Sequence, residues 1–377
     1  MSSEPNPRPD ETPAPRLGHQ PALDGIRGLA VLVVLCHNLH WPGFKGGFFG
    51  VDMFFALSGF LITTLLLEDH ARSGRISLRR FFLRRFFRLY PALVVLMAFS
   101  AISVWFDPRA VSAGRVATVT ASVLAYWSNY LVIANPAGWL GGLNHTWSLA
   151  VEVHFYLIWA ILMGWITARW GRDCRILGLI AAGFAAGSVL WRLFQWSRGA
   201  GETWLYAGTD MRLDAIFLGA LAGLLRWAHL ARSEGPVAPD MDPRLIRTAE
   251  GVAIGVLVFL ITTVPQKSPL PSLGAFAAAG AATSLLILTV LLHRGSLLAA
   301  VVSWPVLAWF GQISYSLYLW HVPVGKLFSL ERLAAHGVPL VAAQLVRVGV
   351  SVAIAAGSYY CIERYFLRLK DRWARAK

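Results

Sequence analysis

The sequence predicts an all-α, polytopic membrane protein, and three observations support this fold class. Apolar residues make up 56% of the 377 residues and charged residues only 14%, whereas soluble domains carry about 25% charged residues. The mean hydropathy is +0.55. Apolar runs of about twenty residues, the length of a membrane-spanning helix, follow one another along most of the chain. A soluble enzyme is therefore excluded.

Eleven apolar segments come close to the length that crosses a bilayer as a helix. The connections between them are short, and none is long enough to fold as a separate domain. The segments cover residues 24–41, 46–67, 89–106, 114–134, 147–168, 176–193, 212–228, 248–265, 272–292, 306–326 and 338–362.

The charge distribution reduces these eleven segments to ten predicted transmembrane helices. The loop DHARSGRISLRRFFLRRFFR and the C-terminal segment RYFLRLKDRWARAK are strongly basic, so both should be cytoplasmic. If the N-terminus is also cytoplasmic, the number of spans must be even. The segment 114–134 is the weakest, because it carries Arg115, Asn129 and several Thr and Ser residues. We therefore expect it to form a re-entrant or interfacial helix.

Three units result from this topology. Residues 1–20 are rich in Pro and charge and lack the apolar core of a signal peptide, which predicts a disordered cytoplasmic tail. Residues 21–366 form the transmembrane domain. Residues 367–377 form a basic cytoplasmic tail.

The net charge of +14 does not indicate a nucleic-acid partner, because that interaction needs its charge on a soluble face. Here the charge lies in clusters between apolar runs. Cys36, Cys174 and Cys361 lie in or beside apolar segments, and their spacing fits neither a disulfide framework nor a metal site. We expect no bound metal and no bound cofactor.

Ionisable side chains inside spans cost several kcal/mol and are functional candidates. In the ten-span topology, Arg27, Arg85 and Arg88 mark the inner face of the membrane. Further candidates lie in the outer half of the membrane or at its rim. They are His37, Asp52, Ser148, Glu152, Asp210, Arg212 and His321.

Structural roles are the alternative for these residues. Asp52 could form an ion pair with Arg212, Glu152 could make a structural hydrogen bond, and His321 could be an interfacial histidine. The arginines near the inner face could serve only as a topology signal with lipid headgroup contacts. His37 is the strongest catalytic candidate, because imidazole is the side chain best suited to move a proton near neutral pH.

The glycine-rich run GGFFGVDMFFALSG at 46–59 is not a phosphate-binding loop, because it has neither the GK[ST] ending nor a preceding strand. Small residues in a membrane helix allow close helix packing instead.

Six blocks of the sequence, in order, resemble the acyltransferase 3 family of bacterial integral-membrane O-acyltransferases. The resemblance extends from about residue 20 to residue 366. The blocks are LDGIRGLAVLVVLCH (23–37), GGFFGVDMFFALSGFLI (46–62), RRFFRLYP (84–91), TWSLAVEVHFYLIW (146–159), TDMRLDAIFLG (209–219) and GQISYSLYLWH (311–321).

The resemblance implies a function and a location. Members of this family transfer acyl groups to sugars of lipopolysaccharide, peptidoglycan, exopolysaccharides and macrolide antibiotics. It therefore implies acyl-CoA, with acetyl-CoA first, as donor, and a sugar, a glycan or a glycosylated natural product as acceptor. It also implies a multi-pass protein of the bacterial cytoplasmic membrane, surrounded by lipid, with both termini cytoplasmic.

The resemblance also implies roles for individual residues. The family's Arg-to-His pair on the first helix is matched by Arg27 and His37, and its RxxR motif by Arg85 and Arg88. In the family, the histidine is thought to act in acyl transfer and the arginines to engage acyl-CoA. We accordingly expect Arg27, Arg85 and Arg88 to bind the donor.

Two departures from the family pattern are present. The family spacing between the arginine and the histidine is one residue longer than here. Because each residue turns a helix by 100°, ten steps leave His37 about 80° away from Arg27 unless a local bulge intervenes. The family's ERPF-like segment reads Glu363-Arg364-Tyr365-Phe366, without the proline, which changes how the last helix ends.

These observations predict a mechanism. His37 acts as general base on the acceptor hydroxyl, or accepts the acyl group itself. Glu152 or Asp52 orients the imidazole. The acceptor is expected to contact Ser148, Asp210, Arg212 and His321. The alternative is a transporter of a small solute or acyl group; that predicts an inverted repeat, and no repeat is visible in the sequence.

Overall fold

A computed structural model describes residues 17–105, 112–136, 140–232 and 242–375, and the elements in these ranges are helical. The tail predicted over residues 1–20 lies mostly outside the described residues. Residues 367–375 of the predicted basic tail belong to a helix that starts at Arg364.

Eleven long helices form the body of the described structure. Shorter helical turns connect them. The long helices are α1 (Pro21–Asn38), α2 (Gly50–Ser73), α3 (Leu78–Trp105), α6 (Trp147–Trp170), α7 (Cys174–Ser197), α9 (Thr209–Arg232), α10 (Pro243–Thr263), α11 (Phe276–Leu292), α14 (Ser314–Leu327), α16 (Leu340–Ser358) and α17 (Arg364–Arg375). The twelve-residue helix α4 (Ala113–Leu124) lies beside this body.

Eight helical segments in the described residues are long and apolar enough to cross a membrane. Two predicted spans fall outside this set. The first is α1, whose eighteen residues include Asp24, Arg27 and His37. The other is split at Ile313 into α13 (Pro305–Gln312) and α14, each too short to cross alone. The all-helical fold is confirmed, and the count of ten stays a prediction.

The weakest apolar segment, 114–134, does not form one long helix. It consists of α4 and α5 (Ser128–Ala134), and the chain turns between them at Tyr126, whose φ is 54°. Neither helix has the roughly twenty residues that a span needs.

Glycines allow α2 and α9 to pack backbone against backbone. A Cβ atom on Gly59 would lie 1.8 Å from the carbonyl oxygen of Ile216, and one on Gly219 would lie 1.9 Å from that of Ala56. Only glycine fits at such a distance. The interpretation of the 46–59 run as a helix-packing motif is therefore confirmed at Gly59.

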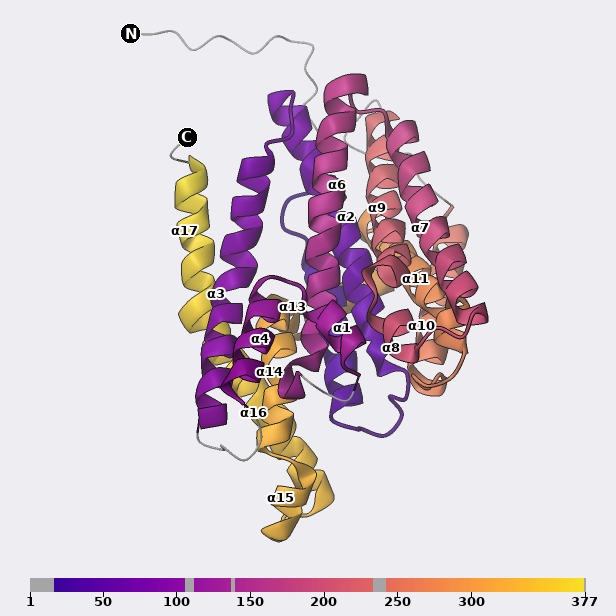
Figure 1. Cartoon of the computed structure of the whole chain (residues 1–377). Coiled ribbons are helices and arrows are strands. Elements are labelled where there is room, and N and C mark those ends of the chain that lie inside the picture. Colours follow the sequence, from indigo (N-terminus) through magenta and orange to yellow (C-terminus); the bar gives the residue numbers. More distant parts are fainter. Residues whose placement is uncertain (1–16, 106–111, 137–139, 233–241, 376–377) are drawn as a thin grey trace.

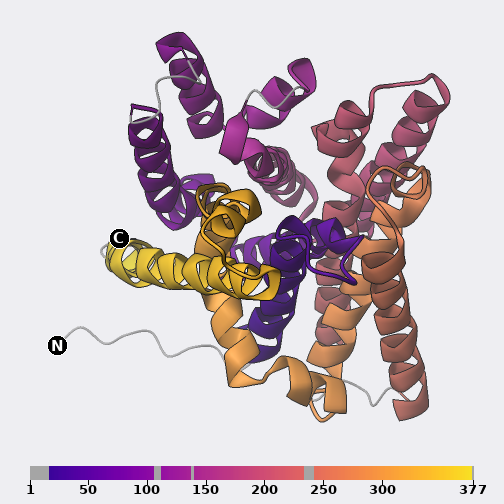
Figure 2. The ribbon, with the colours of Figure 1, turned by 90° about the horizontal axis from the view of Figure 1, so that it is seen from below.

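The helices form a bundle with two different ends. The α2–α3 connection, the C-terminal ends of α6 and α9, and the end of α17 lie together at one end, whereas α15 (Leu330–Ala335) lies at the other (Figure 1). Seen from the α15 end, α1 and α2 run near the centre, between α3 and α4 on one side and α7, α10 and α11 on the other (Figure 2). The most basic loops thus share one end of the bundle.

Candidate active site

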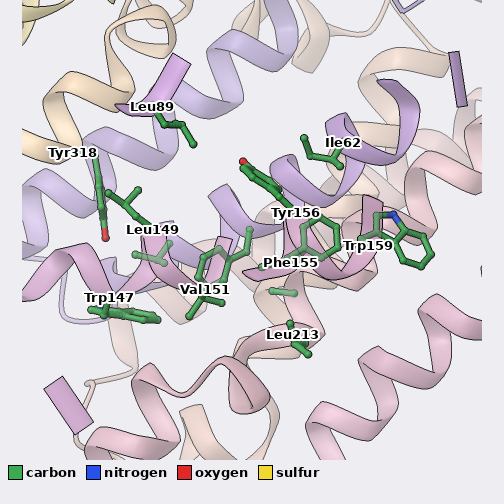
Figure 3. Close-up of a cluster of buried hydrophobic side chains, with 14 of the residues drawn as sticks. Ile62, Leu89, Trp147, Leu149, Val151, Phe155, Tyr156, Trp159, Leu213 and Tyr318 are labelled. Carbon is green, nitrogen blue, oxygen red and sulfur yellow. The ribbon is translucent and has the colours of Figure 1, made fainter. Parts of the chain in front are cut away.

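One cavity lies between α1, α2, α3, α6 and α14. Figure 3 shows several of its walls, with Tyr156 and Tyr318 facing the space between Leu89, Leu149 and Ile62. Side chains of five helices line it: Arg27, Val51, Phe54, Phe55, Ser58, Leu61, Ile62, Arg85, Arg88, Leu89, Ser148, Leu149, Glu152, Tyr156, Ser314, Tyr315 and Tyr318. We call it the inner cavity.

The inner cavity follows one face of α2. Its lining residues on this helix run from Val51 through Ser58 to Ile62, at spacings of three and four residues, which is the spacing of a single helix face. Eleven residues at 1.5 Å each give the cavity a length of roughly 16 Å along α2. It is therefore long and narrow and suits an extended ligand.

Three guanidinium groups face this cavity. Arg27 lies 3.8 Å from Asp24, whereas Arg85 and Arg88 have no ion pair within the described residues. Arg85 lies over the ring of Tyr156, 5.7 Å from its centroid, and its buried Nε has no hydrogen-bond partner in the described part of the chain. Unpaired arginines around a cavity favour an anionic ligand.

Glu152 is the acidic residue of the inner cavity lining. Its Oε1 accepts hydrogen bonds from the hydroxyls of Ser58 and Tyr156, which themselves lie 3.5 Å apart. These two hydroxyl donors hold the carboxylate in place. The lining thus carries three positive groups against one negative group.

The position of Glu152 differs from the expectation that it could orient the imidazole of His37. It is level with Ser58 and shares a cavity with Arg27, Arg85 and Arg88. The reason is that α6 begins deep in the bundle: its first residue, Trp147, packs against Phe55, with ring centroids 6.2 Å apart. The preceding turn, η2 (Gly141–Thr146), occupies the outer part of this span.

His37 lies beyond the far end of the inner cavity. It packs against Gly47, four residues, or about 6 Å along the chain axis, before Val51. Its Nδ1 lies 2.9 Å from the carbonyl oxygen of Phe44, and because a carbonyl only accepts, Nδ1 carries the proton. The other ring nitrogen, Nε2, is then the basic one.

The helix between Arg27 and His37 is continuous, with no π turn. The bulge that would align the two side chains is therefore missing, and they do not form a direct pair. Along α2, the Ser58 level of Glu152 and the Gly47 level of His37 are separated by roughly 16 Å, so Glu152 does not contact the imidazole either.

Asp52 and Arg212 form an ion pair outside the cavity lining. Arg212 Nη2 lies 2.6 Å from Asp52 Oδ1, and both side chains are fully buried. The guanidinium also lies 3.5 Å from the ring centroid of Phe276. A second buried pair, Arg192 and Asp214 at 2.7 Å, lies on the neighbouring turns. Asp52 and Arg212 therefore form the ion pair that was given above as the structural alternative to a role in catalysis.

Asp210 holds two aromatic side chains at the start of α9. Its carboxylate accepts hydrogen bonds from the indoles of Trp191, at 2.9 Å, and Trp204, at 3.3 Å. It does not line the inner cavity.

Ser148 lines the inner cavity, and His321 lies behind it, next to Tyr318. Ser148 Oγ and Tyr318 Oη are 2.5 Å apart, and His321 Nδ1 lies 2.7 Å from the Tyr318 carbonyl oxygen. The ring of His145 lies 5.3 Å from that of His321. Sequence reasoning missed His145, which stands three residues before Ser148 and directly before the block 146–159.

Within the described residues, no group of three or more His, Cys, Asp or Glu side chains is arranged to hold a metal ion.

Comparisons with known proteins give a consistent result. A family model described as an acyltransferase domain matches residues 20–362. The chain is 32% identical over 313 residues to the peptidoglycan O-acetyltransferase OatA of Listeria monocytogenes, covering 81% of this chain and 49% of that protein. It is 31% identical over 353 residues to the putative peptidoglycan O-acetyltransferase YrhL of Bacillus subtilis, covering 91% and 54%.

A putative O-acetyltransferase of Staphylococcus aureus is 30% identical over 359 residues, covering 93% of this chain and 58% of that protein. The chain thus spans about half the length of the curated relatives that it matches. No solved structure matches it.

Proposed function

The chain belongs to the acyltransferase domain family, and from this premise we propose that it is a membrane-embedded O-acyltransferase. It moves an acyl group, most simply acetyl, from acyl-CoA to a hydroxyl of a sugar or glycan. The observation that carries this proposal is the inner cavity, a narrow space roughly 16 Å long whose lining includes Arg27, Arg85 and Arg88.

Acyl-CoA matches the cavity in charge and shape. Its phosphates suit Arg85 and Arg88, because guanidinium groups bind phosphate oxygens bidentately. The pantetheine arm then extends along α2, past Ser58, towards Val51. Since acyl-CoA is made in the cytoplasm, we infer that the basic end of the bundle faces the cytoplasm of a bacterial inner membrane, with both termini on that side.

Acyl transfer takes place at the thioester end of the pantetheine arm. His37 Nε2 removes the proton from the acceptor hydroxyl, and the oxygen attacks the thioester carbonyl. The new C–O bond forms as the C–S bond breaks, and the CoA thiolate takes up the proton. A variant of this scheme passes the acyl group through His37 itself. The fixed Nδ1–H of His37 supports either role.

Glu152 serves the donor in this proposal, because it lies at the level of Arg27 and beside Ser58. Asp52 supports the site indirectly, through its ion pair with Arg212, and Asp210 orders the aromatic side chains at the start of α9. Ser148 and His321 contact the acceptor.

The acceptor is proposed from the relatives. Two of them carry the words "peptidoglycan O-acetyltransferase" in their names, which supports a cell-envelope glycan over the sugar of a secreted natural product. The family match also favours acyl transfer over the transporter alternative, because the matched family model is an acyltransferase domain.

Turnover of labelled acetyl-CoA by the purified protein tests the proposal. We expect release of CoA, and a 10²- to 10⁴-fold slower rate in His37→Ala, the range typical of general-base loss, with acetyl-CoA binding retained. His293→Ala, directly after α11 and outside the inner cavity lining, is the matched control. A wild-type rate in His37→Ala would rule out this base.

A further inference from the structure

A second cavity lies between α3, α4, η2, α14 and α15, and Figure 1 shows α15 at the end of the bundle opposite the α2–α3 connection. The volume of this cavity is about 300 Å³, at the lower end of the 300–1,000 Å³ typical of small-molecule sites. We call it the outer cavity. Its lining residues are Met97, Phe99, Ser100, Ala101, Arg115, Val116, Val119, Thr120, Leu140, Gly141, Gly142, Leu143, Pro323, Lys326, Leu327 and Arg332.

The charges of the outer cavity are of one sign. Arg115, Lys326 and Arg332 belong to its lining, and no Asp or Glu does. The stem of Lys326 lies along η2, because a Cβ on Gly142 would meet its Cδ at 3.4 Å. Arg332 is held across the α14–α15 turn by a 3.3 Å hydrogen bond to the Leu327 carbonyl oxygen. Two cations fixed at one rim favour an anionic ligand.

Only a thin polar layer separates the outer cavity from the inner one. Gly142 and Leu143 line the outer cavity and stand three and two residues before His145, while Pro323 follows His321 by two residues. On the other side, Ser148 and Tyr318 line the inner cavity. The hydroxyl of Tyr318 also donates to the carbonyl oxygen of His145, at 2.9 Å.

The two histidines of this layer are almost completely buried, with 2% of His321 and 8% of His145 exposed. His321 donates from Nδ1 to the Tyr318 carbonyl, as the acceptor-only oxygen requires. Its Nε2 is then a lone-pair nitrogen, and it has no hydrogen-bond partner in the described part of the chain. A buried imidazole left in this state is ready to accept a hydrogen bond from a hydroxyl.

The same stretch of α14 also contacts the helix that carries His37. A Cβ on Gly325 would lie 3.5 Å from a methyl carbon of Leu39, two residues beyond His37. The residue after Gly325 is Lys326. The outer cavity, the buried histidines and the outer end of α1 therefore meet on α14.

We propose that the outer cavity is the acceptor site, and that the acceptor is an anionic sugar whose carboxylate or phosphate binds Lys326 and Arg332. His145 and His321 lie at the boundary of the two cavities, where the acceptor hydroxyl approaches the donor thioester, with Ser148 on the donor side. This inference rests on the proposed function for its donor side, and it adds the chemical class of the acceptor and the residues that select it.

The test measures binding to the full-length protein in nanodiscs of zwitterionic lipid. The probes are the disaccharide of N-acetylglucosamine and N-acetylmuramic acid, its carboxyl methyl ester, which differs only in lacking the charge, and N-acetylglucosamine 1-phosphate. We expect at least about tenfold tighter binding of the acid than of the ester, because a hydrogen bond to a charged group contributes roughly 1.5–3 kcal/mol.

Lys326→Ala combined with Arg332→Ala should abolish the preference for the acid and leave acetyl-CoA affinity unchanged. Arg198→Ala, an exposed cation after α7, should keep that preference. Competition by the sugar phosphate would identify phosphate as an equivalent anion. Equal binding of acid and ester, binding of neither, or a preference that survives the double substitution would each overturn the proposal.

Nanodiscs containing phosphatidylglycerol separate a sugar site from a lipid headgroup site. The preference for the acid should persist there, and its loss would assign the cavity to lipid and contradict the acceptor role. Acetyl-CoA turnover is measured in parallel. Turnover without a preference for the acid would refute only this inference, whereas a preference without turnover would refute the proposed donor chemistry.

Discussion

Two sets of arginines lie among the helices, and they differ in what surrounds the guanidinium group. Arg212 and Arg192 are fully buried, and each is paired with a buried aspartate at 2.6–2.7 Å. Arg85 and Arg88 are only half-buried, lack an acidic partner among the described residues and face a cavity. Charge within a membrane bundle is thus structural where it is paired and packed, and available for a ligand where it is not.

Arg212→Ala should produce the largest effect on stability. It leaves Asp52 buried without its partner, and breaking a buried pair in this way costs about 3–5 kcal/mol. We expect a strongly lowered Tm in detergent, measured by intrinsic tryptophan fluorescence. Replacing both partners, as in Asp52→Leu with Arg212→Met, should recover much of the loss. A single variant with an unchanged Tm would show that this pair does not stabilise the fold.

Gly59→Ala should have a smaller effect on stability. It acts on the contact between α2 and α9, the helices that also carry Asp52 and Arg212. The added methyl group would lie 1.8 Å from the Ile216 carbonyl oxygen, so α2 and α9 must separate, at a cost of about 1–3 kcal/mol typical of overpacking. Gly255→Ala on α10, where the added methyl group meets nothing within 4 Å, is the control. The idea of a backbone contact fails if both variants melt at the same temperature.

Ser58→Ala should have the smallest effect on the fold. Glu152 loses one of two hydroxyl donors and keeps Tyr156, which costs about 1 kcal/mol of stability. Because Ser58 lines the inner cavity, acetyl-CoA affinity should also fall, and this can be followed by calorimetry. Ser314→Ala changes another serine of the same lining and is the matched comparison. A drop in Tm as large as that of Arg212→Ala would show that Ser58 stabilises the fold and does not mainly serve the ligand.

Much of the helical fold could be predicted from the sequence, because apolar run length reports directly on membrane helices. Arg27, Arg85 and Arg88, which were predicted to act together, line one cavity, and their role in donor binding stays a prediction. The ten-span count was not confirmed, because hydropathy does not show that the chain breaks at Ile313 between α13 and α14.

Depth within the bundle was the harder quantity to predict. Glu152 was expected beside His37, because the start of an apolar run was taken as the membrane surface. The η2 turn fills that outer position instead, so that α6 starts at the level of Phe55. His145 was missed for a related reason: only the packing of η2 on α14 brings it to His321. Such contacts between distant segments leave no local pattern in the sequence.

Acetyl-CoA binding to the Arg85→Ala, Arg88→Ala double variant tests the central claim most directly. Each lost charge-assisted hydrogen bond should contribute roughly 1.5–3 kcal/mol, so we expect at least about a hundredfold weaker binding, with a Tm close to that of the wild type. Arg79→Ala, on the same basic helix but outside the inner cavity lining, should bind acetyl-CoA normally. Unchanged acetyl-CoA affinity in the folded double variant would contradict the account.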